Sequence, residues 1–476
     1  MLPRWRPTST KELAPPALRR PRRLVLSILI AIVLFWVLVQ PNGLFFYRRE
    51  LFPKDKRAGS PPRFKEQWQW QESLPQHNTS LPYPEGKTGR YIKFSNQVTR
   101  LGWNNALNEI LLNAHLAYAS ERAYVFQDYV WKPEYYPWAI PFMTFDRFRR
   151  WPRTPLSALI AGPTAGGPWD TVSSHMPRSV TEKYFDKVCP PSERRLINTK
   201  DIKPAINEAS GIVIFETWQR LLLNAPERCI EIEAAPWPAE SYPQTFDLYL
   251  WGSERILSLW DSFSKSPTSR LLATSPLVNS AVARNEHLFG GGDSYDRMMA
   301  MHIRRGDFKG ACLELARWNS TFYSWNLLPF LPDKFTPPPG GWWGANTPEN
   351  TAVYLERCLP SSEAIVEKAR RAREDLARHS TQTHGAQLDV MYLLTNEDGE
   401  WLDAMKRLLK NDGWTTVVTS RDLALNDEQA VVGMAVDMDI ARQAAVFIGN
   451  GWSSFTSNIV HRRLVDGKEP ISIRFW

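Results

Sequence analysis

The sequence predicts an α/β fold built on parallel sheets whose faces are covered by helices. Residues 90–94 alternate as a strand does, and short runs typical of buried strands occur at residues 300–303, 389–394, 415–418 and 445–448. Helical patterns stand between them, at residues 361–378 and 427–444, and an apolar stripe with helical spacing runs from Trp103 to Ala114. Because strands that alternate with helices pair in parallel, we expect sheets with helices on both faces.

Length and charge narrow the class of protein. At 476 residues the chain has about three domain lengths of ~150 residues. Residues 1–60 hold 12 of the 58 Lys and Arg residues but only 3 of the 50 Asp and Glu residues, so the rest of the chain is nearly neutral. A body that binds nucleic acid carries its positive charge on the fold itself, and that function is therefore excluded.

The basic residues surround a candidate membrane anchor. A cluster at residues 19–23 precedes the apolar run 24–39, and Leu44 to Tyr47 extends its apolar character. We predict a cytoplasmic tail at 1–23 and a transmembrane signal anchor at 24–46, with the body in the lumen. A cleaved signal peptide fits less well, because the basic region that precedes the run is over twenty residues long and no small-residue cleavage site follows.

The rest of the chain divides into a stem and two units. Residues 47–88 are rich in proline and predict a stem outside the core. We place one unit at 89–275 and a second at 276–476. Within the first, residues 212–215 are a plausible strand and 131–151 a long loop, while 130–275 as a whole carries no pattern that indicates a function. In the second, residues 318–350 form an inserted loop that we expect over the site.

Cysteines and glycosylation triplets fit a lumenal body. The four cysteines, at 189, 229, 312 and 358, have no zinc-type spacing and can form two disulfides, with three possible pairings. Asn78 and Asn319 begin glycosylation triplets.

Three segments carry the chemistry, and each follows a predicted strand: residues 100–105, residues 302–307, and residues 449–456 together with Asp437. Ligands of open α/β sheets bind outside the carboxyl ends of the strands. A guanidinium such as that of Arg304 suits phosphate, and Gly306 allows a tight turn. A diphosphate-bearing donor is the first hypothesis. The alternative is a surface turn in which Arg304 or Arg305 pairs with Asp307.

In this order the segments resemble the donor-binding motifs of the GDP-fucose protein O-fucosyltransferase family. The matching residues are Gly102-Trp103-Asn104, then His302-Ile303-Arg304-Arg305, then Asp437 and Ile440 followed by Ser453-Ser454-Phe455. The resemblance implies a GT-B architecture of two Rossmann-like domains facing a cleft, 89–275 on the acceptor side and 276–476 for the nucleotide sugar. It also implies inverting transfer of fucose from GDP-fucose to a hydroxyl of a glycan or glycoprotein.

The resemblance assigns roles to individual side chains. Arg304 and Asn104 are the catalytic candidates, with Arg304 clamping the β-phosphate oxygen and Asn104 reaching the diphosphate or fucose. His302 would brace Arg304 or contact phosphate, and Asp437 would accept hydrogen bonds from guanine. The candidate GDP-fucose-binding residues are Gly102, Trp103, Asn104, His302, Arg304, Asp437, Ser453, Ser454 and Phe455.

Each of these residues also has a purely structural interpretation. Asn104 can serve as a helix N-cap, and His302 and Phe455 can be core residues. Arg305 is expected to support the fold by pairing with a carboxylate, which Asp307 can supply. Of Asp437 and Asp439, one is expected to be a solvated or capping residue, and the spacing to the last strand favours Asp437 for the site.

The family resemblance implies no metal and no cofactor, and Asp437 and Asp439 point to different sides of a predicted helix. Some family members carry Glu before the first glycine, where this chain has Leu101, so the general base is open. We expect a type II membrane enzyme of the Golgi or endoplasmic reticulum. The alternatives are a transferase of the same fold that uses another nucleotide sugar and a non-catalytic lumenal lectin or scaffold. The acceptor stays unidentified.

Overall fold

The computed structural model describes residues 57, 60–138, 151–235, 242–306, 308–379 and 388–476. The expected cytoplasmic tail and signal anchor, residues 1–46, lie outside the described residues, and so does Asp307. Among the residues that the structure does describe, no helix combines the length and the apolar character that crossing a membrane requires.

The first sheet has five parallel strands in the order β6-β2-β1-β8-β7. Tyr91 in the central strand pairs with Ala123 on one side and Cys229 on the other. Apolar side chains of α7, including Tyr184 and Phe185, pack on these strands. The elements are β1 (Tyr91–Phe94), α4 (Trp103–Ala119), β2 (Ala123–Phe126), β6 (Val180–Thr181), α7 (Glu182–Val188), β7 (Arg194–Asn198), α8 (Gly211–Asn224) and β8 (Cys229–Glu233).

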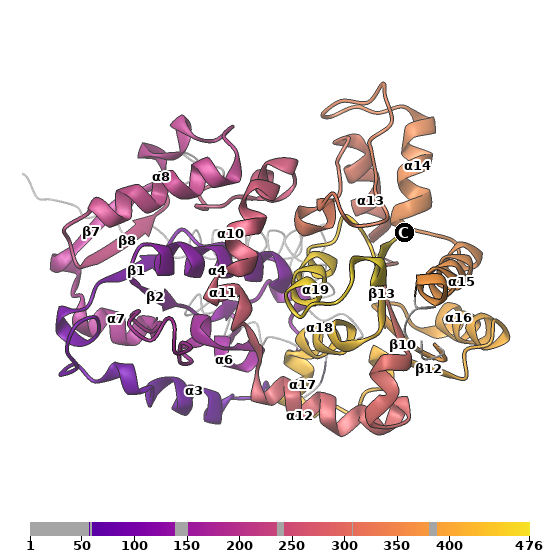
Figure 1. The fold of residues 1–476 in the computed structure, drawn as a ribbon, viewed down its shortest axis with the longest axis horizontal. Helices are drawn as coiled ribbons and strands as arrows, with labels where there is room; N and C mark the ends of the chain where they lie inside the picture. The colour runs from indigo at the N-terminus through magenta and orange to yellow at the C-terminus, as the bar shows by residue number, and fades with distance from the viewer. Residues whose placement is uncertain (1–56, 58–59, 139–150, 236–241, 307, 380–387) are drawn as a thin grey trace, which may run out of the picture. The chain divides into compact units, whose positions relative to one another are not determined.

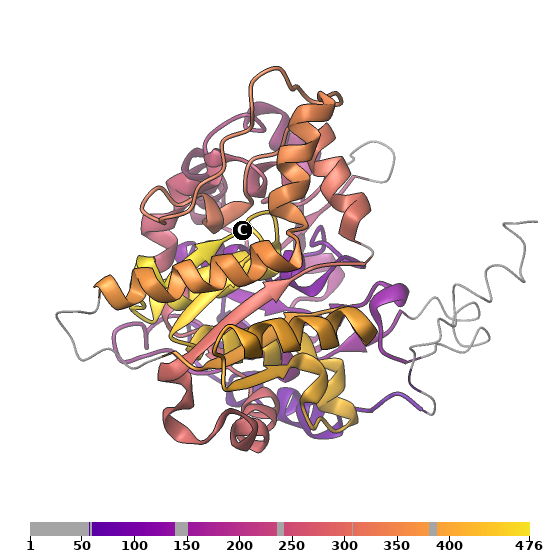
Figure 2. The ribbon, with the colours of Figure 1, turned by 90° about the vertical axis from the view of Figure 1, so that its right-hand side faces the viewer.

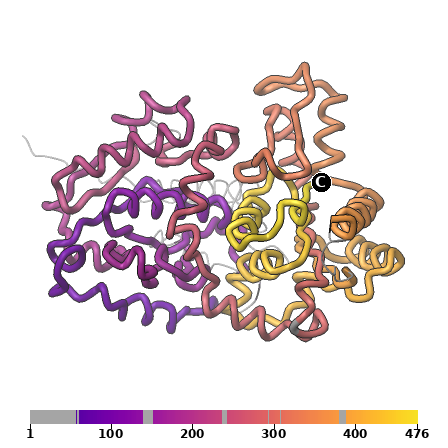
Figure 3. The backbone as a smooth tube through the Cα atoms, in the orientation of Figure 1, coloured from indigo at the N-terminus to yellow at the C-terminus, as the bar shows by residue number. Residues whose placement is uncertain are grey.

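The second sheet also has five parallel strands, in the order β12-β11-β10-β13-β14. It is built from residues 298–475, and Figure 3 shows by colour that the two sheets use separate stretches of the chain. Its elements are β10 (Met298–Ile303), α15 (Ser362–His379), β11 (Val390–Thr395), α16 (Gly399–Asn411), β12 (Thr416–Thr419), α18 (Gly433–Gln443), β13 (Val446–Gly449), α19 (Ser454–Val465) and β14 (Ile473–Phe475).

The described chain contains further α-helices and short strands. They are the helices α3 (Lys65–Glu72), α6 (Leu156–Leu159), α9 (Leu248–Trp251), α10 (Trp260–Lys265), α11 (Pro267–Arg270), α12 (Pro276–Asn285), α13 (Phe308–Arg317), α14 (Pro348–Cys358) and α17 (Asp427–Val431), with the antiparallel pairs β3 (Tyr129–Val130) and β4 (Arg153–Thr154), and β5 (Ile160–Ala161) and β9 (Ala273–Thr274).

The central strand β10 is buried on both faces, which explains why all six of its residues are buried. Its odd-numbered side chains, including Met299 and Met301, belong to one core cluster with residues of α15 and α16. Figure 2 shows these two helices lying across that face, whereas α18 and α19 lie on the other side of the strands in Figure 1. Because side chains alternate along a strand, His302 points to the face of α19.

The strand order of the second sheet creates a switch point. The chain proceeds from β10 to β11 and β12 on one side, and β13 and β14 lie on the other side of β10. The loops that leave β10 and β13 therefore diverge at the carboxyl edge of the sheet. Open α/β sheets bind ligands in the crevice at this point.

Most of the expected elements are present, and one expected strand is a helix. The strands at 90–94, 300–303, 389–394, 415–418 and 445–448 correspond to β1, β10, β11, β12 and β13. The helix expected at 427–444 is divided into α17 and α18. Residues 212–215, predicted as a strand, lie in α8, where Ile214, Trp218 and Leu222 form its buried stripe. Their β-branched run indicated a strand, but the helical spacing of the longer segment decided the outcome.

The expected stem is wrong for its second half. From residue 61 the chain joins the same compact unit as the sheets. Leu74 and Gln76 are buried, and the Gln76 side chain donates to the carbonyls of Gly166 at 2.9 Å and Ser179 at 2.8 Å. The segment also forms the helix α3, so its prolines did not keep it from folding against the core.

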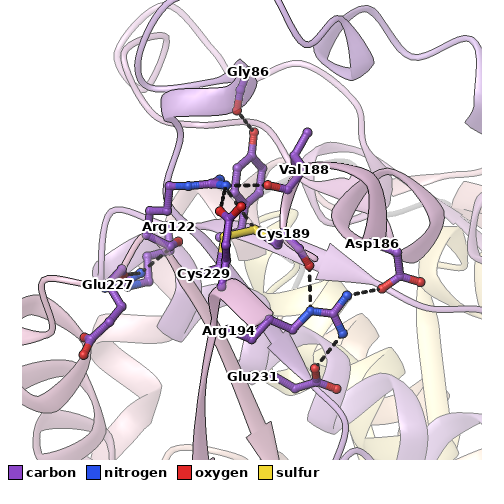
Figure 4. Close-up of a disulfide and its surroundings, with 12 residues drawn as sticks. Gly86, Arg122, Asp186, Val188, Cys189, Arg194, Glu227, Cys229 and Glu231 are labelled. Carbon is purple, nitrogen blue, oxygen red and sulfur yellow. Dashed lines mark hydrogen bonds and ion pairs between the residues drawn. A yellow bond between two sulfur atoms is a disulfide. The ribbon is translucent and has the colours of Figure 1, made fainter. Parts of the chain in front are cut away.

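Two disulfides select one of the three possible pairings. Cys189 is bonded to Cys229, and Cys312 to Cys358. The first bond joins the end of α7 to the start of β8, and Arg194 donates to the Cys189 carbonyl at 2.7 Å beside it (Figure 4). The second joins α13 to the end of α14, close to the switch point.

Candidate functional site

His302 lies at the carboxyl end of β10 and is buried. Its Nδ1 is 3.0 Å from the hydroxyl of Thr456, and its ring centroid is 4.7 Å from that of Phe455. Burial lowers the pKa of His302 to about 3, and the charge of Arg304 acts in the same direction. The imidazole is therefore neutral at physiological pH, and it fastens β10 to the first turn of α19.

The two arginines that follow His302 have different surroundings. The Arg305 guanidinium donates to the Pro360 carbonyl at 2.9 Å, lies 4.5 Å from the Trp401 ring centroid and is 3.9 Å from the Glu397 carboxylate. A carboxylate thus accompanies Arg305 as expected, and Glu397 supplies it. The Arg304 side chain is half-buried, with its guanidinium 5.0 Å from the ring centroid of Phe308.

Gly306 closes this turn with a φ of 60°, in the left-handed region that disfavours residues with a Cβ atom. The turn takes the chain from β10 into α13. Arg304 is therefore presented at the edge of the sheet by a turn whose backbone geometry depends on glycine.

The loop from β13 to α19 is packed so tightly that it requires its glycines. A Cβ atom on Gly449 would lie within 2.4 Å of Thr456, and one on Gly451 within 2.3 Å of the Phe322 ring. Asn450 donates to the Cys358 carbonyl at 3.0 Å. Ser453 is the N-cap of α19 and accepts from the Phe455 amide at 3.2 Å. The positive end of a helix dipole thus lies at the switch point, an arrangement that suits an anion.

Asn104 lies in α4, which follows β1 of the first sheet, yet it contacts α19 of the second. The side-chain amide of Asn458 donates to the Asn104 carbonyl at 3.0 Å and to its side-chain oxygen at 3.2 Å. Gly102, and not Asn104, is the N-cap of α4. The Trp103 side chain is 2% exposed and packs edge-on against Tyr129, so this side chain belongs to the core.

Tyr323, in the inserted loop, was not among the candidate residues. Its hydroxyl donates to the Asn105 side chain at 3.2 Å, and its backbone amide donates to the Gly451 carbonyl at 2.9 Å. Asn326 also donates to that carbonyl, at 2.9 Å. The inserted loop thus does pack on the site, and Tyr323 links α4 to the β13–α19 loop. Its position in a loop without periodicity carried no signal in the sequence.

Asp437 and Asp439 have separate environments on α18. The Asp437 carboxylate accepts hydrogen bonds from the hydroxyls of Tyr392 and Ser420, the latter at 2.8 Å. Burial raises the pKa of Asp437 to about 6. Asp439 is buried in an ion pair with Arg442 at 2.8 Å and is a structural residue. The carboxylate oxygens of Asp437 have further lone pairs beyond those that accept from these two hydroxyls.

Glu109 is a buried carboxyl beside the first motif. Its Oε2 accepts from the Val98 backbone amide at 2.7 Å, which anchors the loop that leads to Gly102. Desolvation raises the pKa of Glu109 to about 8, so the side chain is protonated at neutral pH.

Replacing Glu109 by glutamine is expected to make stability less dependent on pH. Between pH 4.5 and 8 the native state keeps this proton while the unfolded state releases it, so wild-type stability falls as pH rises through that window. As pH rises through this window, Glu109→Gln should therefore gain free energy of unfolding relative to wild type. The full gain is about 1.4 kcal/mol for each unit by which burial raises the Glu109 pKa. Urea unfolding at pH 5, 7 and 9 measures this. A difference between the two proteins that stays constant over this range contradicts the prediction.

The structure thus brings together members of all three sequence motifs. Asn104 contacts α19 through Asn458, and His302 contacts it through Thr456. Ser453, Ser454 and Phe455 form the start of the same helix, and Arg304 stands two residues beyond His302. In the part of the chain that the structure describes, no group of three or more His, Cys, Asp or Glu side chains is arranged to hold a metal ion.

Comparison with known proteins finds solved structures of low similarity to this chain. No family model matches the chain, and no curated protein matches it by sequence. POFUT1 in complex with GDP-fucose has a TM-score of 0.46 and 14% identity, over 81% of this chain and 98% of that one. The NodZ alpha-1,6-fucosyltransferase soaked with GDP-fucose has a TM-score of 0.34 and 12% identity, over 78% of this chain and 91% of that one. A mutant of Arabidopsis thaliana FUT1 in complex with GDP has a TM-score of 0.33 and 9% identity, over 88% of this chain and 76% of that one.

Proposed function

We propose that this chain is an inverting glycosyltransferase that moves fucose from GDP-fucose to a hydroxyl of a glycan or glycoprotein. The transfer needs no metal ion in this proposal, and the donor is held at the carboxyl edge of the second sheet. The protein would act in the secretory pathway, as a type II membrane protein of the Golgi or endoplasmic reticulum.

One observation carries the proposal. Motifs near residues 102, 302 and 453 are far apart in the sequence, yet contacts at 3.0 Å join the first to α19 through Asn104 and Asn458, and the second to α19 through His302 and Thr456. They meet where the strand order reverses, which is where α/β sheets bind nucleotides. A surface turn that happened to contain two arginines would not gather the other two motifs.

The chemistry makes one bond and breaks one. The acceptor oxygen attacks C1 of fucose from the face opposite the diphosphate, and the C1–O bond to the β-phosphate breaks with its electron pair leaving on GDP. The acceptor proton passes to the departing diphosphate or to a general base. Negative charge grows on the β-phosphate oxygen as this bond breaks. Hydrogen-bond donors and positive groups that point at this oxygen therefore lower the activation barrier of transfer.

The residues at the switch point suit these tasks. The amino terminus of α19 and the guanidinium of Arg304 supply positive charge for the diphosphate. Phe455 is partly exposed beside the neutral ring of His302 and offers an aromatic surface to the base or ribose. Asp437 would accept from the guanine amine, as carboxylates do from nucleobase amines.

Two disulfides support a lumenal site of action. Both pairs of cysteines are oxidised in the structure, and such bonds persist in the secretory pathway and not in the cytosol of most organisms. Asn78 is exposed and could accept a glycan, whereas the Asn319 amide donates to the Gly341 carbonyl at 3.3 Å.

Nucleotide selectivity tests the donor class without knowledge of the acceptor. Binding of GDP, GDP-fucose, GDP-mannose, UDP and UDP-galactose to the purified full-length protein is measured by calorimetry. We expect GDP and GDP-fucose to bind and UDP to compete at least about tenfold more weakly, a difference of 1.4 kcal/mol. Preferential binding of UDP would indicate another nucleotide sugar. A protein that binds none of the five would be a lectin or scaffold.

A further inference from the structure

A cavity of about 780 Å³ lies outside the switch point. One wall comes from residues 200–208 and 242–255 and the other from residues 318–343 of the inserted loop. Its volume is within the roughly 300–1,000 Å³ of small-molecule sites. The cavity is therefore large enough to hold a ligand other than the nucleotide sugar.

Four aromatic side chains of the cavity wall are exposed to solvent. The exposed fractions are 64% for Trp343, 42% for Trp318, 44% for Tyr249 and 41% for Tyr242. The two tryptophan rings stack with centroids 5.8 Å apart, and the two tyrosine rings meet edge to face at 4.5 Å. Tyr249 and Trp343, from opposite walls, are 6.1 Å apart. Grouped, exposed rings of this kind mark a binding surface.

The rings are held by buried polar contacts on the first wall. The ammonium of Lys203 is buried, donates to the Gln244 carbonyl at 2.7 Å and pairs with Asp247 at 2.8 Å. Asp247 in turn caps the helix that carries Tyr249. These contacts of the Lys203 ammonium hold the backbone of the segment from Tyr242 to Tyr249 in place. The two tyrosine rings are therefore positioned before any ligand binds.

The cavity adjoins the donor site through the inserted loop. Thr321 lines the cavity and donates to the Gly252 carbonyl, also in the wall, at 3.4 Å. Two residues further on, Tyr323 contacts Asn105 and Gly451 of the donor-binding motifs. A ligand in the cavity is therefore only a few residues of chain away from the place where fucose would be released.

We propose that this cavity is the acceptor subsite and that it binds an oligosaccharide. This inference rests on the proposed glycosyl transfer. The flat, negative faces of the rings suit the polarised C–H faces of pyranoses. The exposed carboxylates of Glu208 and Glu254, which also line the wall, suit sugar hydroxyls as hydrogen-bond acceptors. The exposed ammonium of Lys200 in the same wall can donate to sugar hydroxyls, so hydrogen-bond donors and acceptors both lie beside the rings, which suits a chain of sugars.

Substitution of Trp343 tests the assignment, and the chain supplies a matched control. Trp342 is adjacent, 69% exposed and not part of the cavity wall. The probes are tetramers of β-linked N-acetylglucosamine, β-linked glucose, mannose and galactose, with binding to the full-length protein followed by calorimetry. We expect at least one tetramer to bind wild type and Trp342→Ala alike. Trp343→Ala and Tyr249→Ala should weaken its binding by roughly tenfold or more.

Binding of GDP-fucose to the same variants separates this inference from the proposed function. We expect Trp343→Ala to bind GDP-fucose as wild type does. If no tetramer binds wild type, or if Trp343→Ala binds as tightly as Trp342→Ala, the subsite is wrong even when GDP-fucose binds. The subsite would also be wrong if an acceptor protein without glycans received fucose and Trp343→Ala left that transfer unchanged. Failure of GDP-fucose itself to bind wild type would overturn the donor proposal as well.

Discussion

Arg304→Ala is expected to lower fucose transfer by about 10²- to 10³-fold, the usual effect of removing one group that stabilises transition-state charge. The guanidinium would neutralise charge that develops on the β-phosphate oxygen only as the sugar bond breaks. The loss should therefore appear mainly in kcat, with a smaller weakening of GDP binding. Hydrolysis of GDP-fucose in the absence of acceptor provides the measurement, and circular dichroism confirms that the variant is folded.

Arg305 is the matched control because it adjoins Arg304 and carries the same group. Its contacts with Pro360, Trp401 and Glu397 belong to the fold. Arg305→Ala should lower the midpoint of thermal unfolding and reduce turnover far less than Arg304→Ala. If the folded Arg305→Ala protein loses as much turnover as Arg304→Ala, the assignment of the phosphate clamp to Arg304 is wrong.

Loss of the Cys312–Cys358 disulfide is the second large effect that we expect. The bond closes a sequence separation of 46 residues, and the chain-entropy relation gives about 4 kcal/mol for a loop of this length. The double variant Cys312→Ser with Cys358→Ser should lose about that much free energy of unfolding, measured with urea. Its GDP-fucose affinity should also fall, because the Cys358 carbonyl accepts from Asn450 in the β13–α19 loop and α13 begins four residues after Arg304.

The Cys189–Cys229 disulfide provides the comparison. It closes a similar separation, 40 residues, but lies in the first sheet among structural ion pairs such as Arg194–Glu231 at 2.9 Å (Figure 4). The double serine variant at 189 and 229 should lose comparable stability and keep its affinity for GDP-fucose. Equal loss of affinity in both double variants would contradict a specific link between Cys312–Cys358 and the donor site.

Local pattern identified four strands of the second sheet but missed β14, and in the first sheet it identified only β1. Strands such as β10 are short, apolar and bounded by clear turns, so their sequences identify them. β8 has an alternating pattern in Cys229–Glu233, which indicates a strand, yet the neighbouring apolar run at 212–215 was more conspicuous and belongs to a helix. Short apolar runs fit either structure until packing against a partner is known.

The sequence by itself determined the three motifs, their order and the chemistry of their side chains, because residue type and spacing are local properties. It also indicated that Arg305 has a structural role. Only the tertiary structure decided that Thr456, Asn458 and Tyr323 join the motifs, that the cysteines pair as 189 with 229 and 312 with 358, and that exposed rings from 242–249 and 318–343 share one cavity. Such contacts connect residues up to 354 positions apart and depend on how strands are ordered and loops are packed, which no local pattern encodes.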